Sequence, residues 1–336
     1  MLAAALADDT TGALELGAML AKFRARVLLR ATPWPAGADV VVLDTQSRHV
    51  APEAAQAIVF EHARRLRQAN VLWIFKKTDS TLRGPVGAEF DGLLEAFPER
   101  SLVYAPAYPR LGRTVVKGIL RVNGIPVAES EFAHDPLNPV TESSVVALIR
   151  SSCRHSSRVT IHDAETEFEM ERIAESLWPA EEIAAGPAGF AGQWARLLPL
   201  PTSTPPPLPR VAKPFVVCGS LHPNSRAQSE LARQLGVGVL ESPPQRVPNP
   251  QQAAKEIAAC AAKAVHSGRA DILILFGGDT AREVFDALGC CELSSGGEIA
   301  PGVPVSFTES GFPVITKAGG FGKPELIREI LESLRS

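Results

Sequence analysis

Hydrophobic and polar positions alternate along the first half of the chain in a repeating order of short apolar run, polar turn and helical pattern. Apolar runs cover residues 2–7, 25–29, 40–43, 71–75 and 102–105. Runs of this length between turn residues are typical of buried strands. Apolar positions spaced three and four apart predict helices from Gly12, where Thr10 and Thr11 are N-cap candidates, and over 52–68 and 86–97. The alternation predicts an α/β fold with a mostly parallel, doubly wound sheet.

Polar side chains follow four of the predicted strands. Because parallel strands joined by right-handed crossovers end at the same edge of a sheet, we expect these residues to converge on one pocket. Four separate solvated loops are the alternative. Arginine and lysine bind carboxylate or phosphate oxygens and aspartate binds hydroxyls, so the pocket suits a small polyhydroxylated anion. The residues are Asp8, Asp9, Asp44, Arg48, Lys77, Asp79, Ser80, Arg83, Tyr108 and Arg113.

The densest part of this pattern is the segment FKKTDSTLRGPVG at residues 75–87. We place the end of its strand at Phe75, so that both Lys76 and Lys77 lie beyond the strand. The adjacent Asp8 and Asp9 form the second unusual feature, because capping a helix needs only one aspartate. At least one of the pair is therefore a candidate for a functional role.

Residues 115–139 interrupt the alternation with turn signals, including Asn123-Gly124, and predict a hairpin-containing excursion that serves as a lid or an interface. His134-Asp135 could be a catalytic or metal-binding pair, but a turn is favoured beside two prolines. A strand at 159–161 precedes a helix over 165–177, which we expect His162 and Asp163 to cap.

The proline-rich stretch 198–214 has no periodic pattern and predicts a stiff connection. We therefore divide the chain into an N-terminal domain of residues 1–200, a linker of residues 201–213 and a C-terminal domain of residues 214–336. At 336 residues, two domains are expected on length as well.

Three predicted strands of the second half, at 215–217, 272–276 and 313–316, each end in a turn that contains glycine. Helices are predicted from near Pro223, over 250–266, from after Thr280 through Leu288, and from Pro324. Glycines let backbone amides approach phosphates, and a following helix contributes its positive end. Neither the dinucleotide fingerprint nor the Walker motif occurs in these turns, so we predict a nucleotide site of another design. Its candidate residues are Ser220, Gly277, Gly278, Asp279, Thr280, Lys317, Gly319, Gly320 and Gly322.

Composition excludes several classes of partner. With 34 basic and 37 acidic residues the net charge is −3, and without a basic tract a nucleic-acid partner has no electrostatic support. The apolar runs are too short for a membrane span, and the first seven residues lack the basic start of a signal peptide. Five cysteines without a CxxC pair fit a reducing cytoplasm.

Taken together, these motifs resemble the four-carbon acid sugar kinase family, which includes D-threonate and D-erythronate kinases. The resemblance spans nearly the whole chain, which is shorter than typical members. Thr10, Cys218 and Ala318 depart from the family pattern, in which the last two are usually serine. The matching segments are ADDTTGA at 7–13, DTQSR at 44–48, KKTDSTLRGPVGAE at 76–89, APAYPRLGRT at 105–114, VNGIPVAESEFAHDPLNPV at 122–140, GGDTA at 277–281, PGVPV at 301–305 and KAGGFG at 317–322.

The resemblance implies that the N-terminal domain binds a sugar acid and that the C-terminal domain binds ATP, with transfer across the cleft between them. It assigns Arg83 and Lys77, with Arg48 or Arg113, to the substrate carboxylate and the developing phosphoryl charge. Asp9, or else Asp8 or Asp79, would orient or deprotonate the attacking hydroxyl. Mg²⁺ is expected with ATP, although the sequence identifies no metal ligands, and a homodimer is compatible with it.

Two other functions stay open. A non-catalytic sugar-acid sensor that keeps the kinase fold is motivated by the shortened chain and Ala318. A nicotinamide-dependent dehydrogenase is suggested only by the α/β pattern and lacks the glycine fingerprint.

Overall fold

The computed structural model describes residues 3–30, 32–135, 137–178, 181–208, 210–243 and 249–335. Contacts divide the chain into two units, each described below by itself. The first unit comprises Met1–Leu16 and Ala38–Pro201, and the second comprises Gly17–Gly37 and Thr202–Ser336. The segment 17–37 thus belongs with the C-terminal part of the chain.

The first unit contains a parallel sheet with the strand order β3-β1-β4-β10-β5-β9. All five side chains of β1 and of β3 are buried, as expected for strands covered on both faces. The strands are β1 (Ala3–Ala7), β3 (Val40–Asp44), β4 (Trp73–Lys77), β5 (Ser101–Tyr104), β9 (Val159–Ile161) and β10 (Glu182–Gly186).

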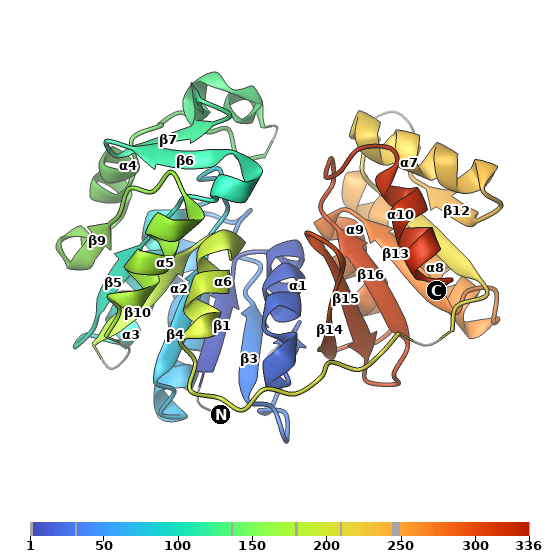
Figure 1. Ribbon diagram of the computed structural model, residues 1–336, viewed down its shortest axis with the longest axis horizontal. Coiled ribbons are helices and arrows are strands. Elements are labelled where there is room, and N and C mark those ends of the chain that lie inside the picture. Colours follow the sequence, from blue (N-terminus) through green and yellow to red (C-terminus); the bar gives the residue numbers. More distant parts are fainter. Residues whose placement is uncertain are drawn as a thin grey trace. The chain divides into compact units, whose positions relative to one another are not determined.

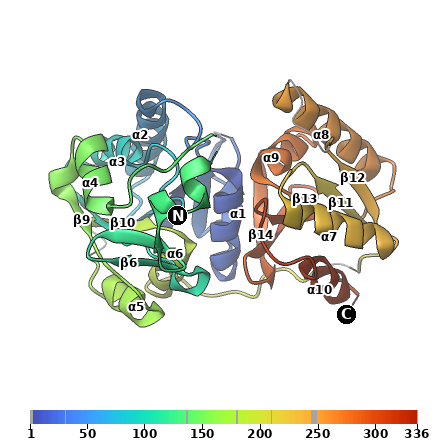
Figure 2. The same cartoon turned by 90° about the horizontal axis from the view of Figure 1, so that it is seen from above.

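Helices cover both faces of this sheet (Figures 1 and 2). α2 (Pro52–Gln68), α3 (Val86–Ala96) and α4 (Val145–Ser152) lie on one face, and α5 (Glu167–Glu175) and α6 (Ala188–Arg196) lie on the other. Phe75 of β4 packs against Phe190 and Trp194 of α6, with ring centroids 6.0 and 5.3 Å apart. α1 (Thr10–Met19) begins in the first unit, and its last three residues belong to the second.

The excursion predicted after β5 is an antiparallel three-stranded sheet of β6 (Arg113–Val116), β7 (Ile119–Val122) and β8 (Ile125–Pro126). Asn123 and Gly124 both have positive φ, as a tight hairpin turn requires, so the hairpin prediction is confirmed. Short 3₁₀ turns flank it: η2 (Pro109–Leu111), η3 (Val127–Glu129) and η4 (Glu131–His134). A further one, η5 (Ser156–Arg158), precedes β9.

The second unit contains a mixed sheet with the strand order β12-β11-β13-β16-β15-β14-β2. Strands β12, β11, β13 and β16 run parallel, whereas β15, β14 and β2 continue the sheet antiparallel. The strands are β2 (Arg26–Leu28), β11 (Pro214–Cys218), β12 (Gly238–Glu241), β13 (Ile272–Phe276), β14 (Glu292–Ala300), β15 (Val303–Thr308) and β16 (Pro313–Lys317).

Four α-helices of the second unit lie in pairs on the two faces of its sheet (Figure 2). α8 (Pro250–His266) and α9 (Gly278–Ala287) pack together on one face, and α7 (Pro223–Gln234) and α10 (Leu326–Ser333) on the other. A 3₁₀ turn, η1 (Ala21–Phe23), precedes β2. The core contains Ile272, Ile274, Ile315 and Ile327, all of them buried. None of the described helices has the length and apolar character needed to cross a bilayer.

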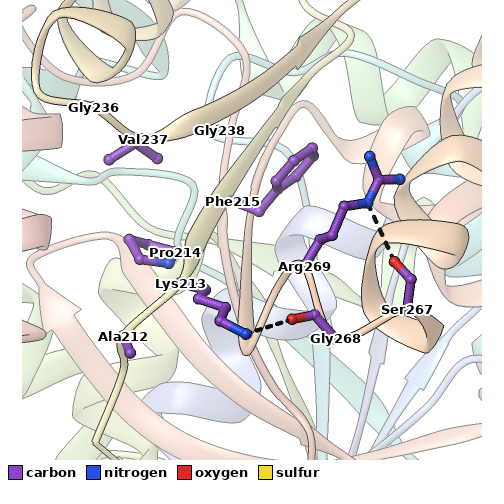
Figure 3. Close-up of a pocket in the computed structure, with 10 residues that line it drawn as sticks. All are labelled: Ala212, Lys213, Pro214, Phe215, Gly236, Val237, Gly238, Ser267, Gly268 and Arg269. Carbon is purple, nitrogen blue, oxygen red and sulfur yellow. Dashed lines mark hydrogen bonds between the residues drawn. The ribbon is translucent and has the colours of Figure 1, made fainter.

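A cavity of about 630 Å³ opens at the amino-terminal ends of β11 and β12 (Figure 3). It is lined by Lys213, Phe215, Gly238 and Arg269, among other residues. Ligands of open α/β sheets bind beyond the carboxyl ends of strands. This cavity lies at the opposite end and is not the candidate nucleotide site.

Several sequence-based boundaries were wrong. β4 extends to Lys77, so Lys76 and Lys77 belong to the strand and do not follow it. Asp9, and neither threonine, caps α1, because its Oδ1 accepts a hydrogen bond from Gly12 N at 2.8 Å. Thr166, and neither His162 nor Asp163, caps α5 through a capping box with Glu169.

Candidate active site

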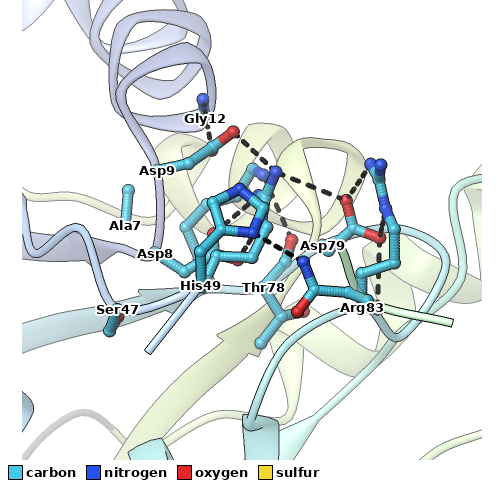
Figure 4. A network of polar contacts seen from close by, with 12 residues as sticks. Ala7, Asp8, Asp9, Gly12, Ser47, His49, Thr78, Asp79 and Arg83 are labelled. Atoms are coloured by element: carbon cyan, nitrogen blue, oxygen red, sulfur yellow. Dashed lines mark hydrogen bonds and ion pairs between the residues drawn. The ribbon is translucent and has the colours of Figure 1, made fainter. Parts of the chain in front are cut away.

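Arg48 joins the aspartates that follow β1. Its Nε and Nη2 donate hydrogen bonds to the two carboxylate oxygens of Asp8 at 2.6 and 3.0 Å, and its Nη1 donates to Asp9 at 2.6 Å. Figure 4 shows Asp8 and Asp9 near the Asp79–Arg83 pair. The geometry follows from the parallel register, which sets Ala7 of β1 opposite Asp44 of β3. All three guanidinium nitrogens therefore have carboxylate partners within the chain.

Asp79 and Arg83 form a second arginine–carboxylate pair in the turn after β4. Nε and Nη2 of Arg83 donate to the two oxygens of Asp79 at 3.1 and 2.7 Å, and Asp79 Oδ2 lies 3.8 Å from Arg48 Nη1. Burial alone would raise the pKa of Asp79, but the attraction of Arg83 and Arg48 outweighs burial and holds this pKa well below its usual value. Thr81 also donates its backbone N–H to Asp79, at 2.9 Å.

The same balance applies to Asp8. Burial opposes ionisation, yet Arg48, Lys76 and Lys77 together lower the pKa of Asp8. The side chain of Asp8 is 3% exposed, that of Asp79 is 7% exposed and that of Asp9 is 19% exposed. Of the three candidate bases, Asp9 is thus the one a ligand reaches most easily.

Lys77 is the last residue of β4 and is buried, and its ammonium donates a hydrogen bond to the Thr78 carbonyl at 3.1 Å. Within the described parts of the chain, no carboxylate lies at ion-pair distance from this group. A methyl group added to Gly12 would lie 2.9 Å from Lys77 Nζ and 2.7 Å from Asp9 Oδ1, so both groups face the first turn of α1. Lys77 therefore keeps donors for a ligand beside Asp9.

Lys76 points elsewhere, to a buried ion pair with Glu89 of α3 at 3.0 Å. Ser47 donates a hydrogen bond to the same carboxylate, and burial raises the pKa of Glu89 despite the attraction of Lys76. We did not predict this pair from the sequence, because an acidic residue in the first turn of a helix usually complements the helix dipole.

The remaining predicted residues lie around the Asp79 turn. Ser80 is part of that turn and is partly exposed. Tyr108 is buried, and its ring packs where a side chain on Gly189 of α6 would otherwise lie. The guanidinium groups of Arg83 and Arg113 lie 5.5 and 6.0 Å from the centre of the Phe132 ring.

The turn predicted at His134-Asp135 is present, since Asp135 Oδ1 accepts hydrogen bonds from the backbone of Leu137 and Asn138. Its other oxygen accepts a hydrogen bond from Arg83 Nη1 at 3.2 Å. No local pattern could indicate this contact, because 52 positions separate the two residues.

In the second unit, the three glycine-bearing turns lie against one another. A methyl group on Gly219 would fall 1.8 Å from Thr280 Oγ1, and one on Gly319 would fall 3.1 Å from Ser220 Oγ. Gly277 has φ +104°, which a residue with a side chain rarely adopts. Gly278 and Asp279 form the first turn of α9. These positions leave backbone and hydroxyl groups at the carboxyl ends of β11, β13 and β16.

Lys317, the last residue of β16, supplies the cation of this region. Its ammonium donates to Ser225 Oγ at 3.2 Å and to the Ala318 carbonyl at 3.1 Å, and lies 4.4 Å from the centre of the Phe276 ring. Burial lowers the pKa of Lys317 to about 8. Among the residues described, no carboxylate pairs with it, so an anionic ligand would be favoured here.

Gly320 and Gly322 complete the third turn with positive φ values of 69° and 79°. The ring of His222 packs against Gly320, and its Nδ1 accepts a hydrogen bond from Asn224 N at the start of α7. We did not predict His222 from the sequence. No group of three or more His, Cys, Asp or Glu side chains in the described ranges could hold a metal ion.

The chain matches two family models. Residues 3–158 match a sugar-binding N-terminal domain and residues 251–327 match a nucleotide-binding C-terminal domain. A D-threonate kinase of Salmonella typhimurium is 29% identical, covering 97% of this chain and 96% of its own length. A D-threonate kinase of Bordetella bronchiseptica is 28% identical, and the match covers 89% of this chain and 87% of the relative. A D-erythronate kinase of Heliobacterium modesticaldum is 29% identical, and the match covers 66% of this chain and 58% of the relative.

The chain belongs to the four-carbon acid sugar kinase family.

Solved structures agree with the fold. A Haemophilus influenzae protein, 21% identical, covers 98% of this chain and 99% of its own with a TM-score of 0.78. A Bordetella bronchiseptica protein, 27% identical, covers 99% and 98% with a TM-score of 0.52, and was crystallised with bound citrate as a domain-swapped dimer. A homodimer of this member of the family stays a prediction.

Proposed function

We propose that this protein is an ATP-dependent kinase that phosphorylates the terminal hydroxyl of a four-carbon sugar acid, such as threonate or erythronate, to give the 4-phosphate. Membership of the family and the names of its relatives support the substrate class. The observation that carries the proposal is the position of Lys77, a buried ammonium with unused donors next to the Asp9 carboxylate.

Asp9 is the best candidate for the group that orients the attacking hydroxyl and accepts its proton. Its Oδ1 is held by Gly12 N and its Oδ2 by Arg48, which fixes the carboxylate while leaving part of it exposed. Asp8 is paired with Arg48 through both oxygens and is almost fully buried. Asp9 is therefore better suited than Asp8 to contact substrate.

Lys77, Arg83 and Arg113 are the cations we assign to the substrate carboxylate and to the charge that develops on the transferred group. Arg113 is partly buried and lies at ring-stacking distance from Phe132, as does Arg83. Arg48 has its three nitrogens on Asp8 and Asp9, so we assign it the role of positioning those carboxylates. Fixed charges of this kind lower a phosphoryl-transfer barrier without reorganising during the reaction.

The second unit would hold the nucleotide through Ser220, the Gly277–Thr280 turn, Lys317 and the Gly319–Gly322 turn. Backbone amides at the start of α9 and the Lys317 ammonium suit a polyphosphate. ATP would supply the phosphoryl group, and Mg²⁺, which binds mainly through phosphate oxygens and water, would accompany it.

A coupled assay of ADP formation with threonate, erythronate and 3-oxo-tetronate tests the proposal directly. We expect ADP release that depends on one of these acids, and ³¹P NMR of the product should show phosphate coupled to the terminal CH₂ group. A sugar acid that raises the melting temperature without any ADP formation across the panel would favour a non-catalytic sensor instead.

Asp9→Asn sharpens the site assignment. The amide still accepts the hydrogen bond of the α1 cap but is a very weak base, so turnover should fall by about 10²–10⁴-fold. Asp163→Asn is the matched control, since Asp163 also accepts a backbone hydrogen bond, from Gly118, and is exposed. Unchanged turnover in Asp9→Asn would remove Asp9 from the catalytic role.

A further inference from the structure

Arg83 faces more negative charge than it can neutralise. Two of its nitrogens bind the carboxylate of Asp79, and the third, Nη1, donates to Asp135 Oδ2 at 3.2 Å. The side chains of Arg83 and Asp135 are 28% and 18% exposed, so solvent screens this pair only in part. One guanidinium thus serves two carboxylates of the chain.

Asp135 is held in place without help from Arg83. Its Oδ1 accepts hydrogen bonds from Leu137 N at 3.0 Å and Asn138 N at 2.8 Å, directly after η4. Burial opposes ionisation of Asp135, but these backbone donors and Arg83 lower its pKa. The residue is therefore a fixed negative charge next to Nη1 of Arg83.

Phe132 of η4, the 3₁₀ turn directly before Asp135, contacts both arginines. Its ring lies near the guanidinium groups of both Arg83 and Arg113. The excursion thus places the Phe132 ring next to both arginines and the Asp135 carboxylate next to Arg83. Arg113, by contrast with Arg83, has no ion pair to a carboxylate within the described residues, and its buried Nε lacks a hydrogen-bond partner.

These contacts make the two arginines unequal toward a ligand. A ligand carboxylate that approaches Arg83 must displace Asp135 or accept repulsion from both Asp135 and Asp79. A hydroxyl meets no such penalty, because it can donate to a carboxylate and accept from the guanidinium. A carboxylate near Lys77 and Arg113 encounters cations that form no ion pair with a carboxylate among the residues described.

We propose that Asp135 is a specificity-determining residue of the sugar-acid site. Its carboxylate occupies Nη1 of Arg83, the guanidinium nitrogen that does not bind Asp79. The site therefore selects ligands that have one carboxylate and a hydroxylated far end over dicarboxylates. This inference rests on the proposed function of the first unit as a sugar-acid site. It concerns the choice of ligand, and makes no claim about phosphoryl transfer.

Binding can be measured by calorimetry without nucleotide, using threonate as the monocarboxylate and tartrate as the dicarboxylate. Asp135→Asn keeps the acceptor for Leu137 and Asn138 but removes the charge. The ratio of the two affinities should shift toward tartrate by about tenfold, the order expected for a partly exposed charge contact. The shift should vanish when Arg83→Gln is added to Asp135→Asn.

Glu129→Gln is the matched control, because Glu129 lies in the neighbouring 3₁₀ turn η3 and carries the same charge without an ion pair to Arg83. An equal shift in Glu129→Gln, an unchanged ratio in Asp135→Asn or a shift toward threonate would each overturn the proposal. Melting curves of the variants check that each is folded.

The kinase assay on the unaltered protein separates this inference from the proposed function. Threonate binding without ADP formation would contradict the kinase and leave the selectivity test valid. If neither acid binds to the unaltered protein or to Asp135→Asn, the sugar-acid site itself is wrong, and the role of Asp135 is rejected with it.

Discussion

The candidate sites of the two units consist of different chemical groups. In the first unit, charged side chains neutralise one another: Arg48 holds Asp8 and Asp9, and Arg83 holds Asp79 and Asp135. In the second unit, glycine turns and hydroxyls surround Lys317, which has no carboxylate partner in the described part of the chain. The first arrangement suits a ligand that both donates and accepts, and the second suits a polyanion.

The difference also concerns how each site is kept in shape. Paired buried charges cost much desolvation, but once formed they fix side chains in direction and position. Glycine turns fix the backbone and leave space where a side chain would stand. Charge removal should therefore damage the first unit most, and added volume should damage the second.

The largest effect is expected from Arg48→Met. Removing this cation leaves the buried Asp8, and the partly buried Asp9, without their main partner, which should cost about 3–5 kcal/mol of unfolding free energy. Denaturant titration measures the loss. Arg196→Met breaks an exposed pair with Glu171 and should cost no more than about 1 kcal/mol. Similar losses in both variants would mean that the buried pairs are not structurally important.

Gly219→Ala should have the next largest effect. The added methyl group would meet Thr280 Oγ1 at 1.8 Å, so the hydroxyl must rotate away from the turns. A rearrangement of this kind costs about 1–3 kcal/mol. If ADP binding requires the original position of the hydroxyl, calorimetry should show a loss of ADP affinity of about fivefold to 150-fold. Gly192→Ala, with nothing within 4 Å of the new methyl group, should leave ADP affinity unchanged. Unchanged affinity in both variants would place the nucleotide elsewhere.

The smallest effect is a pH dependence that belongs to Lys317. Burial lowers its pKa to about 8 in the folded protein, from 10.5. The charge that attracts phosphate is present below pH 8 and is lost above it, so ADP affinity should fall about threefold to tenfold from pH 7 to pH 9. Calorimetry of Lys317→Met should show a much flatter profile, and an equally steep one would assign the titration to another group.

The same shift affects stability with the opposite sign. Between pH 8 and 10.5 the folded state has released the proton that the unfolded state still binds, so unfolding free energy should rise with pH relative to Lys317→Met. Affinity and stability thus change in opposite directions over this range. Their comparison separates a phosphate-binding lysine from one that is merely buried.

Periodicity predicted the regular elements well where one pattern dominated. The bounds of α2, α8 and β13 match the predicted ranges, because long amphipathic helices and continuous apolar strands give strong signals. β10 and β14 were not predicted. β14 contains Ser294, Ser295, Gly296 and Gly297, and its pairing with β15 and β2 supplies the stability that its own pattern does not indicate.

Residue types near strand ends predicted which charged side chains gather beyond the first strands, but not how they pair. Asp8, Asp9 and Arg48 were all candidates, yet only the parallel register shows that Arg48 is already occupied by both aspartates. Residues 17–37 belong with the second unit, which local composition could not indicate.

The order of residues along the chain is sufficient to predict the α/β alternation, the acidic and basic residues after the first strands, and the glycine turns of the second half. These are local properties, set by side-chain chemistry and backbone freedom. Three contacts appear only once the chain is folded: Asp135 with Arg83, Glu89 with Lys76, and Gly219 with Thr280. Such contacts join residues that are distant in the chain. They depend on strand register and on burial, which the local pattern of apolar and polar residues does not specify.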